Sequence, residues 1–471
     1  MARFLLRKLH LLTTAGLASK SSITIPRVIG KQSYHRAQRL FTVSSSIQSN
    51  VSVAPKPPLS VLPASVLLRS FLIAIISSKP YLLHPSLSIL SYLAKPSRSW
   101  LFSVDRNPVL YWILRRTCYA QFCAGENRQE VEAYGRQMKQ MGISGIIPTY
   151  AKESVFDGRE RNELRMGTVA RERSKSAKCA NVEAWRLGTL ETASMLTEGD
   201  QLALKLTGAG PLATKAFAAG NLPPQQVLDA LDEVCQACKK RKARVLVDAE
   251  SQYYQKGIAK VTVELMRKYN RDGHALVFNT YQAYLKGTPQ RLSRDLALAA
   301  EEGWTVGVKL VRGAYMATEE RSLIHDTKEE TDGAYNYMAQ NLLRQDKGLM
   351  AAGPRLTFPS VNLLLATHNK HSALEALRIY RERVGAGFPT VPLQFAQLQG
   401  MSDDVTFSLL QSKDDGGKPP EVLKCTTWGT LGECLAYLLR RAMENRDAVS
   451  RTRDEYLALR KELRRRMLFG L

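Results

Sequence analysis

Short β-type runs alternate with longer amphipathic segments over the last two thirds of the chain, and this alternation restricts the fold more than any other feature. Eight runs rich in Val, Ile, Leu and Thr follow one another, with helical apolar spacing between them. Eight β/α repeats over about 330 residues are typical of a parallel (βα)₈ barrel. The runs lie at residues 143–149, 202–206, 244–247, 275–280, 306–311, 362–366, 391–395 and 421–424.

The alternative arrangement is an open doubly wound sheet. We disfavour it because no Gly-x-Gly-x-x-Gly turn follows any early strand. A barrel further predicts that functional side chains gather where strands end, since active sites form at the carboxyl-terminal face. Polar groups follow at least six of the predicted strands, and they include Lys205, Asp248, Gln282, Lys309, Arg312, Thr367, His368 and Gln397.

The helix after the eighth run has two distinct faces. Its apolar residues, Leu431 to Ala442, recur at helical spacing, which predicts core packing. A sector largely opposite carries two arginines with polar neighbours, and two interpretations remain open. This sector is either a solvated face with an i,i+4 ion pair or a clamp in which guanidinium groups bind a carboxylate bidentately. Its members are Glu433, Tyr437, Arg440, Arg441 and Glu444.

Charge is distributed unevenly along the chain. The formal net charge is +24, and the first 104 residues hold 13 Lys and Arg with no Asp or Glu. An Arg-rich, Ser-rich and acid-free start is typical of a mitochondrial transit peptide. The competing interpretation, a basic arm that binds nucleic acid, lacks interleaved aromatic residues and charge runs. We therefore expect no nucleic-acid partner.

The apolar segments after the transit region are too interrupted to predict a membrane span. The strongest candidate, residues 59–78, contains Pro63 and carries Arg69 near its middle. Together with residues 81–93 it predicts helices that either pack on the domain or lie against a membrane surface. Of the two, packing on the domain is favoured.

The cysteines and histidines do not form a recognisable metal or disulfide pattern. Seven cysteines at irregular spacing predict no disulfide framework, and Cys235 and Cys238 lie in a helical pattern without a second pair. His368 and His371 have ligand chemistry, as do Asp248 and Glu250, but their spacing favours no metal. A Schiff-base lysine at Lys205 or Lys309 is disfavoured because it would leave the paired arginines unexplained.

Six segments, in order, resemble the proline dehydrogenase family in its fungal or animal mitochondrial form. The resemblance extends from about residue 106 to 466 and includes FCAGE at residues 122–126. The segments are LVDAESQYYQKGI, FNTYQAYLKGTPQRL, VKLVRGAYMATEE, TKEETDGAYN, LATHNKHS and AYLLRRAMEN.

The resemblance implies both a fold and an activity. It implies a distorted (βα)₈ TIM-like barrel with an N-terminal helical arm, in an FAD enzyme that oxidises L-proline or a related cyclic imino acid to pyrroline-5-carboxylate. It further implies ubiquinone as electron acceptor at the matrix side of the inner mitochondrial membrane. The expected division of the chain is a transit peptide and linker at 1–50, an arm at 51–140 and a catalytic barrel at 141–471.

Family positions carry over to individual residues. On the substrate side, the resemblance implies that Arg440 and Arg441 bind the carboxylate, that Glu444 braces them, and that Asp248 orders the ion pairs. Lys205 and Tyr437 belong to the same surface. On the flavin side, it implies roles for Gln282, Lys309, Val311, Arg312, Gly313, Ala314, Tyr315, Lys328, Thr367, His368 and Asn369.

One position departs from the family pattern. Members usually carry a tyrosine at the end of the eighth strand, where its ring packs on the substrate, and here that position is Cys425. The alternatives are therefore a hydroxyproline-preferring enzyme, a weakened paralogue, or a basic membrane-surface protein of the mitochondrion without enzyme activity.

Overall fold

The structure of the protein is a computed structural model that describes residues 57–94, 102–150, 179–316, 319–350, 356–447 and 449–469. These residues belong to one compact unit. The predicted transit peptide, residues 1–50, lies outside the described residues. So do the side chains of residue 436, residues 444–447 and residues 449–452.

All strand pairs in the nine-stranded sheet are parallel, and the sheet follows the order β1-β9-β8-β7-β6-β5-β4-β3, with β2 also on β9. The strands are β1 (Cys123–Gly125), β2 (Gly145–Tyr150), β3 (Gln201–Leu204), β4 (Arg244–Val247), β5 (Val277–Gln282), β6 (Val306–Val311), β7 (Val361–Ala366), β8 (Leu393–Leu398) and β9 (Glu421–Trp428).

All eight predicted strands form, as β2 to β9, so the predicted barrel class is confirmed. The largest boundary difference is at β9, which continues four residues past the predicted end because β2 pairs with it from Leu423 through Trp428. Sequence reasoning missed β1, a three-residue strand that pairs with the end of β9. A strand of that length has too few residues to show a period of two.

The barrel is curled but not closed by backbone pairing at every seam. Within the described residues, β2 and β3 share no ladder. A side chain bridges them instead. Asp200, which precedes β3, accepts the backbone N–H of Ile146 in β2 at 2.9 Å, and its other oxygen accepts the N–H of Thr197.

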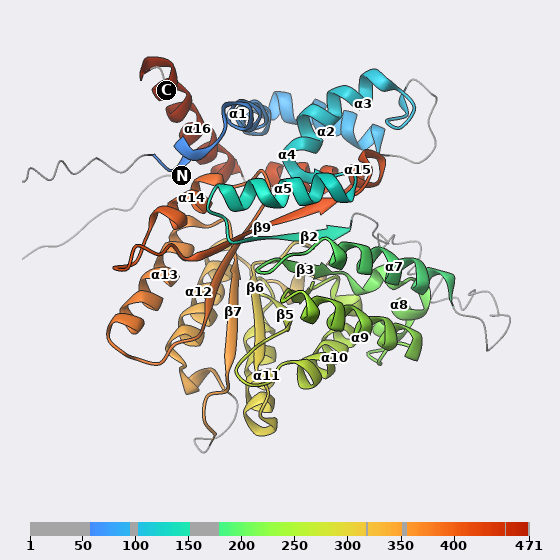
Figure 1. Ribbon diagram of the computed structural model, residues 1–471, viewed down its shortest axis with the longest axis vertical. Helices are drawn as coiled ribbons and strands as arrows, with labels where there is room; N and C mark the ends of the chain where they lie inside the picture. Colours follow the sequence, from blue (N-terminus) through green and yellow to red (C-terminus); the bar gives the residue numbers. More distant parts are fainter. Residues whose placement is uncertain are drawn as a thin grey trace, which may run out of the picture. The chain divides into compact units, whose positions relative to one another are not determined.

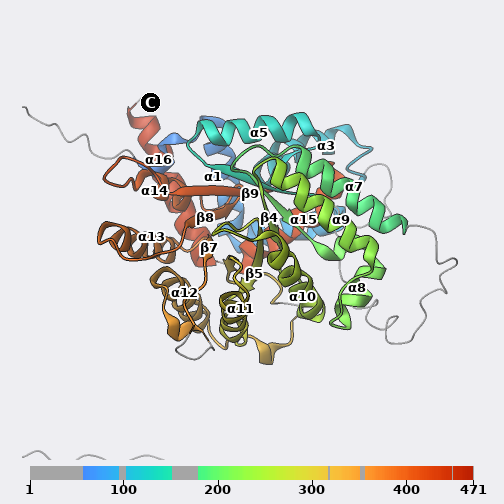
Figure 2. The ribbon, with the colours of Figure 1, turned by 60° about the horizontal axis from the view of Figure 1, so that its bottom comes forward.

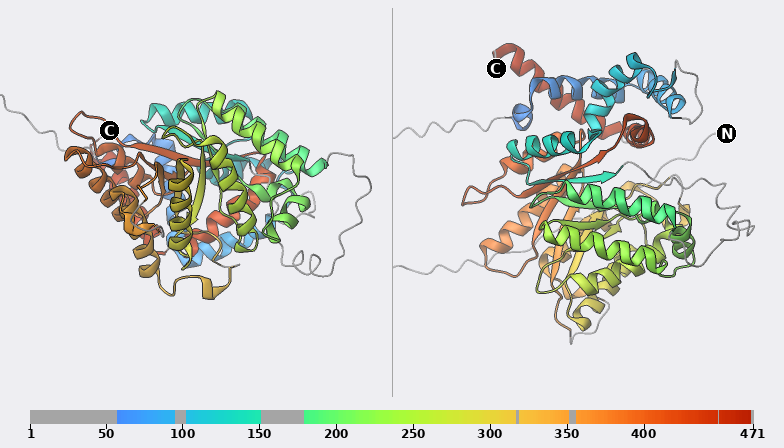
Figure 3. Two further views of the ribbon diagram at one scale, coloured as in Figure 1. Left: turned by 90° about the horizontal axis from the view of Figure 1, so that it is seen from below. Right: turned by 45° about the vertical axis from the view of Figure 1, so that its right-hand side comes forward.

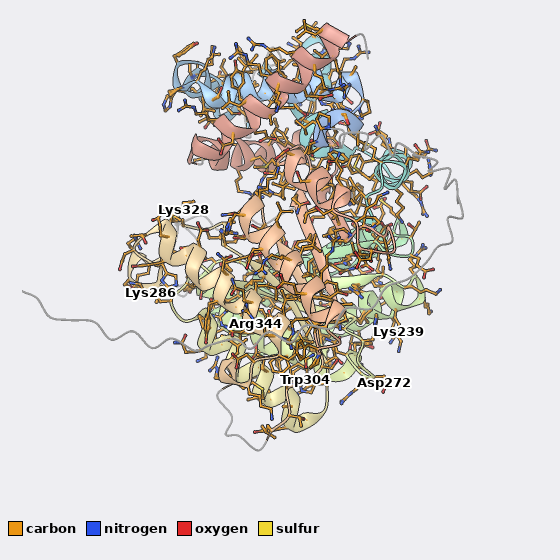
Figure 4. All side chains as sticks on the ribbon, turned by 90° about the vertical axis from the view of Figure 1, so that its left-hand side faces the viewer. Lys239, Asp272, Lys286, Trp304, Lys328 and Arg344 are labelled. Atoms are coloured by element: carbon orange, nitrogen blue, oxygen red, sulfur yellow. The ribbon has the colours of Figure 1, made fainter. Side chains whose placement is uncertain are left out.

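Amphipathic helices surround the strands, as Figure 2 shows. Figure 4 shows Lys286 and Lys328 toward the end where the strands finish, and Asp272 and Trp304 at the opposite end. The surrounding helices are α7 (Ala180–Ser194), α8 (Pro211–Ala218), α9 (Gln225–Lys240), α10 (Gln252–Tyr269), α11 (Thr288–Glu302), α12 (Lys328–Arg344), α13 (Lys370–Gly385) and α14 (Asp403–Gln411).

The barrel departs from a regular (βα)₈ arrangement at its last helix. Helix α15 (Leu431–Asp447) follows β9 but packs in a cluster with α2 and the segment before β1, and not with the outer helices. The place beside β2 is taken by α5 (Arg128–Gln140), whose Val131 and Met138 pack on Ile146 and Trp428. The helix that carries the paired arginines therefore lies at the end of the strands (Figure 1).

An N-terminal arm of helices packs around α15. It consists of α1 (Ala64–Ser78), α2 (Pro80–Leu93), α3 (Pro108–Leu114), the turn η3 (Arg115–Tyr119) and α4 (Ala120–Phe122), and α1 lies along the last helix, α16 (Val449–Phe469). Figure 3 shows this layer at one end of the unit. None of the described helices is long and apolar enough to cross a membrane alone. Together, α1 and α2 are long and apolar enough, but the two helices are bent by 102° relative to each other.

Candidate active site

Strand alternation determines which side chains enter the barrel. Because side chains alternate along each strand, residues 203, 246, 364 and 423 point to one side and share an apolar cluster within the barrel. The next inward position on three of these strands is polar: Lys205, Asp248 and Cys425. The barrel therefore has an apolar plug, and a polar layer lies above it where the strands end. The plug consists of Ile147, Ala203, Leu246, Ala275, Phe278, Leu364, Ala396 and Leu423.

Asp248 is the centre of this polar layer. One carboxylate oxygen lies 2.6 Å from Nζ of Lys309, and the other lies 3.4 Å from Nζ of Lys205. Burial alone would raise the pKa of the carboxyl, but attraction by Lys309 and Lys205 outweighs it and the pKa is lowered. Asp248 therefore remains a carboxylate that holds two cations in place.

Lys309 forms an ion pair within this network. The resemblance implies a flavin role for it, and in the structure its Nζ donates to Asp248. Asp248 does not cap the next helix, because Ser251 accepts the N–H of Tyr253 in α10. Its role here is electrostatic.

Cys425 lies within reach of the same charges. Burial raises the pKa of its thiol, Lys309 and Arg441 lower it, and Asp248 raises it, with a net upward shift. The thiol therefore stays neutral at physiological pH. Lys309 comes from β6 and Arg441 from α15. Cys425 therefore lies between the ion pairs at the strand ends and α15, the helix with the paired arginines, which we call the arginine helix.

Helix α15, which carries the paired arginines, presents Tyr437 and Arg441 toward Cys425. Tyr437 is 8% exposed, and the guanidinium of Arg441 lies 5.2 Å from its ring centroid. Both arginines are partly buried, not fully solvated. This favours the carboxylate-clamp interpretation over the solvated face. The side chain of Glu444 lies outside the described residues.

The start of α15 is fixed from two directions. Thr430 and Glu433 form a capping box, in which the N–H of Thr430 donates to Glu433 at 2.9 Å. Glu126, from the segment after β1, accepts the N–H of Leu431 at 2.8 Å. The apolar side of the helix then packs into the arm through Leu431, Cys434, Leu435 and Leu438.

A second network surrounds the end of β6. Arg312 donates to Asp332 at 2.6 Å, to the Thr367 hydroxyl at 2.6 Å and to the Ser372 hydroxyl at 2.9 Å. Its guanidinium also lies 4.3 Å from the ring centroid of Tyr335. One arginine thereby links the end of β6 to α12, to the end of β7 and to α13.

The loop after β6 depends on a glycine. Gly313 has φ 142°, and a Cβ at this position would lie 2.2 Å from the ring of Tyr284. A larger residue would therefore push the loop carrying Ala314 and Tyr315 off the end of β5.

The end of β7 leads directly into helix α13. Asn369 caps α13 by accepting the N–H of Ser372, and His368 Nε2 accepts the N–H of Leu398 on the neighbouring strand. Lys328 lies apart from these groups. It is exposed at the start of α12 and paired with Asp332 at 2.5 Å (Figure 4).

Comparison with known proteins identifies the family of this chain. The family profile described as "Proline dehydrogenase" matches residues 131–454. The chain belongs to the proline dehydrogenase family. It is therefore a member of an oxidoreductase family, as the sequence resemblance predicted.

Curated proline dehydrogenases and hydroxyproline dehydrogenases are both among its relatives. "Probable proline dehydrogenase, mitochondrial" of Schizosaccharomyces pombe is 30% identical over 443 residues, 85% of this chain and 88% of that one. "Hydroxyproline dehydrogenase" of Bos taurus is 30% identical over 76% of this chain and 82% of its own length. "Proline dehydrogenase 1, mitochondrial" of Homo sapiens is 34% identical, but the chain spans only 42% of its length.

Solved structures agree on the fold. Proline utilization A (PutA) from Bdellovibrio bacteriovorus has a TM-score of 0.62 at 16% identity, over 85% of this chain and 41% of that chain. PutA from Bradyrhizobium japonicum gives 0.52 at 17% identity, over 87% of this chain and 41% of its own. These likenesses support a barrel like that of proline dehydrogenases.

The residues present fit a flavin of the kind that proline dehydrogenases carry in general. Gln282 ends β5 beside Val311, is buried, and its side-chain Nε2 has no hydrogen-bond partner among the described residues. A buried amide donor without a partner is costly unless a ligand accepts from it. A ring carbonyl of a flavin is an acceptor of the required type.

Sequence reasoning missed the structural roles of three acidic residues around the site, of which Glu250 was considered only as a metal-ligand type. Asp332 binds both Arg312 and Lys328, and Glu126 fixes α15. Glu250 is 7% exposed and accepts the N–H groups of Leu206 and Thr207. All three residues lie inside the segments that resemble the family, which could have drawn attention to them. None of them belongs to a chemical motif that would have indicated its role.

The other cysteine and metal candidates have simpler surroundings. Cys235 and Cys238 are both fully buried in the main hydrophobic core of the barrel. Within the part of the chain that the structure describes, no group of three His, Cys, Asp or Glu side chains is arranged to hold a metal.

Proposed function

We propose that this chain oxidises L-proline to pyrroline-5-carboxylate with FAD as cofactor, the first step of proline catabolism. The observation that carries the proposal is the position of Arg441, a half-buried arginine of α15, beside Cys425 and the network of Lys205, Asp248 and Lys309, with half-buried Arg440 next to it on the same helix. Membership of the proline dehydrogenase family supports the same substrate class.

The charges of the site are complementary to an amino acid with a free carboxylate. Three cationic side chains, Lys205, Lys309 and Arg441, lie around Cys425 and Asp248, and burial raises the pKa of the nearby Glu250 carboxyl. A substrate carboxylate would reduce this excess of positive charge, and planar guanidinium groups would hold it bidentately in one orientation. Arg440 and Arg441 bind the carboxylate in this proposal, and Lys205 assists.

The same cations affect the substrate amine. A positive surrounding disfavours a protonated ring nitrogen, so the neutral amine needed for oxidation is stabilised. Bound FAD would supply the acceptor for the hydride that leaves the ring carbon next to nitrogen. The contribution of the chain is to orient that carbon, exclude water and keep the amine neutral, and it needs no general base.

The proposed cofactor residues lie around the ends of β5, β6 and β7. Gln282 would donate to the flavin ring, and the segment from Val311 to Tyr315 would lie along it. Thr367, His368 and Asn369 would contact the adenylate end, close to the start of α13. Lys328 would approach the phosphates, where a positive charge is useful.

Relatives named mitochondrial support a mitochondrial location for this chain. We place the mature protein at the matrix side of the inner membrane, with ubiquinone as electron acceptor. Residues 1–50 would act as transit peptide and linker, 51–140 as arm and 141–471 as catalytic barrel. A tagged full-length chain should therefore be imported into mitochondria, and a cytosolic tag would contradict the location.

A second candidate function is oxidation of hydroxyproline. Two observations favour it: Cys425 stands where the family resemblance leads one to expect a tyrosine, and relatives named hydroxyproline dehydrogenase match 76% of the chain. A smaller side chain next to the substrate ring leaves room for an added hydroxyl.

Flavin absorbance is the most direct test. The purified protein should be yellow, release FAD on denaturation, and bleach anaerobically when L-proline is added. A protein that is colourless and takes up no FAD on reconstitution would remove the oxidoreductase proposal. The basic membrane-surface protein without enzyme activity would then be the leading alternative.

A further inference from the structure

Large apolar side chains are exposed on the N-terminal arm. Eight of them, on three helices, are between 46% and 68% exposed, and six of the eight define a surface. They contrast with the barrel, where apolar residues of the helices mostly face the core. We call these six residues the arm surface: Leu68 and Leu72 of α1, Tyr81 and Ile89 of α2, and Val109 and Trp112 of α3.

The exposure has helical periodicity. In α1, Leu67 and Ala74 are buried while Leu68 and Leu72 are exposed, so this helix is apolar on its packed face and on its outer face. Val109 and Trp112 of α3 form an exposed stripe that Arg116 of η3 continues. A water-facing helix normally has a polar outer face, so apolar residues there indicate that something covers it.

The charges around the arm surface are mostly basic, with Asp105 before α3 as an exposed acidic residue. Described residues 57–94 contain Arg69 and Lys79 and no Asp or Glu. Arg116 lies over the ring of Trp112 with its guanidinium 4.9 Å from the ring centroid. The neighbouring helix α16 carries seven Lys and Arg against three Asp and Glu, and it ends with exposed Met467 and Leu468. Apolar residues mixed with basic ones complement an anionic lipid surface.

The geometry of the arm is suited to lying on a membrane surface and not to crossing the membrane. Helices α1 and α2 are bent by 102° to each other. Their other sides are occupied, because α1 packs on α16 and α2 packs on α15. Phe71 of α1, for example, stacks on Tyr456 of α16 with ring centroids 5.6 Å apart.

We propose that the arm surface docks on an anionic lipid bilayer and thereby places the arginine helix close to the membrane. The inference deepens the proposed function, because it names the surface through which an enzyme with a membrane-bound electron acceptor would meet its membrane. Only α2 and the neighbouring helices of the arm separate α15 from that surface.

The experiment is flotation of the full-length protein with lipid vesicles. One set of vesicles is phosphatidylcholine alone, and the other contains about a fifth cardiolipin, which is anionic. We expect flotation with the anionic vesicles, weakened by salt. The double variants Leu68→Glu with Leu72→Glu, and Val109→Glu with Trp112→Glu, should each lower the partition coefficient at least about tenfold.

A matched control comes from the far side of the barrel. Val384 and Phe388, at and just after the end of α13, are 54% and 61% exposed. The double variant Val384→Glu with Phe388→Glu has the same chemistry and similar exposure, and it should float like the natural protein. Equal loss in this control would mean that added charge alone prevents binding, which would overturn the assignment of the arm surface.

Two other results would also overturn the proposal. One is flotation of both arm variants to the same extent as the natural protein. The other is a natural protein that stays unbound and dimeric while the arm variants become monomeric, since a second copy would then cover the surface. Turnover of L-proline with a soluble dye acceptor is measured in parallel. It tests the proposed enzyme activity separately and should be unchanged in the arm variants.

Discussion

The carboxylate of Glu126 accepts the backbone N–H of Leu431 at 2.8 Å, across 305 residues of sequence. Its other oxygen accepts the hydroxyl of Tyr111 at 2.5 Å and lies 3.6 Å from Arg115. A residue of the arm segment is thereby bound both to the arm and to the first turn of the helix that carries Arg440 and Arg441. The arm therefore contributes to the position of the proposed carboxylate clamp.

Glu126→Ala should weaken substrate binding without touching the substrate. Loss of a charged acceptor at a helix start costs about 1–2 kcal/mol and frees the first turn of α15 to move. We expect KM for L-proline to rise about tenfold, with flavin content unchanged. Steady-state kinetics with a soluble acceptor measure this.

The matched control for that variant is Glu132→Ala. Glu132 lies in the same segment but makes an exposed i,i+4 ion pair with Arg128, which contributes little. An unchanged KM in Glu126→Ala, or an equal rise in both variants, would show that Glu126 does not position α15.

Arg440→Met and Arg441→Met should each impair turnover through loss of carboxylate binding. The expected cost in kcat/KM is about 2–5 kcal/mol, because both side chains are partly buried. Methionine keeps the apolar stem and removes the charge. As a control, Arg460→Met on α16 removes an exposed arginine and should be silent. Ordinary proline kinetics in both α15 variants would restore the solvated-face interpretation.

The barrel was predictable because its signal is local and repeated. Eight short β-type runs, separated by segments with helical apolar spacing, are enough to predict eight parallel strands and the end at which the site forms. The polar positions Lys205, Asp248 and Lys309 at strand ends followed from that rule, and the structure brings them together.

The remainder depends on contacts between distant segments. Nothing in the pattern after Trp428 indicates that α15 packs into the arm and leaves its place beside the barrel to α5, because both helices are amphipathic in the ordinary way. Likewise, the partner of Lys309 is 61 residues away in sequence and is chosen by strand register. Only the folded arrangement shows that Lys309 pairs with Asp248.

Asp248→Asn should destabilise the protein at neutral pH by about 3 kcal/mol, because two partly buried lysines lose their carboxylate. The folded pKa of Asp248 is lowered, so its contribution is fully present above the ordinary Asp pKa of about 3.9 and is lost as the pH falls below that value toward the folded pKa. The difference in Tm between natural protein and variant should therefore be constant from about pH 5 to 8 and shrink below about pH 4.

The comparison for that pH series is Asp326→Asn, whose carboxylate is 70% exposed and pairs weakly with Lys286 at 3.3 Å. It should leave Tm unchanged at every pH. A difference for Asp248→Asn that grows toward acid would contradict the lowered pKa and the network drawn from it.

The final prediction concerns the substrate preference set by Cys425. Its thiol is neutral, since burial raises its pKa, and it lies near Asp248 and Arg441. Cys425→Tyr would add an apolar ring against the pyrrolidine and a hydroxyl directed toward Asp248. We expect kcat/KM for L-proline to rise several-fold, by about 1 kcal/mol, and the ratio of trans-4-hydroxy-L-proline to L-proline turnover to fall. Anaerobic flavin bleaching by each substrate measures both.

The control for this variant is Cys425→Ser, which keeps the shape of a small side chain without adding a ring and should leave that ratio close to its natural value. Protection provides an independent readout. At alkaline pH, where the thiolate can form, L-proline should slow alkylation of Cys425 by iodoacetamide and should not slow alkylation of Cys179, which lies at the start of α7. Peptide mass spectrometry measures both rates. A tyrosine variant that gains nothing on L-proline, together with alkylation that substrate does not slow, would place Cys425 outside the substrate pocket. The preference for proline or hydroxyproline would then have to be set by the residues around Arg440 and Arg441.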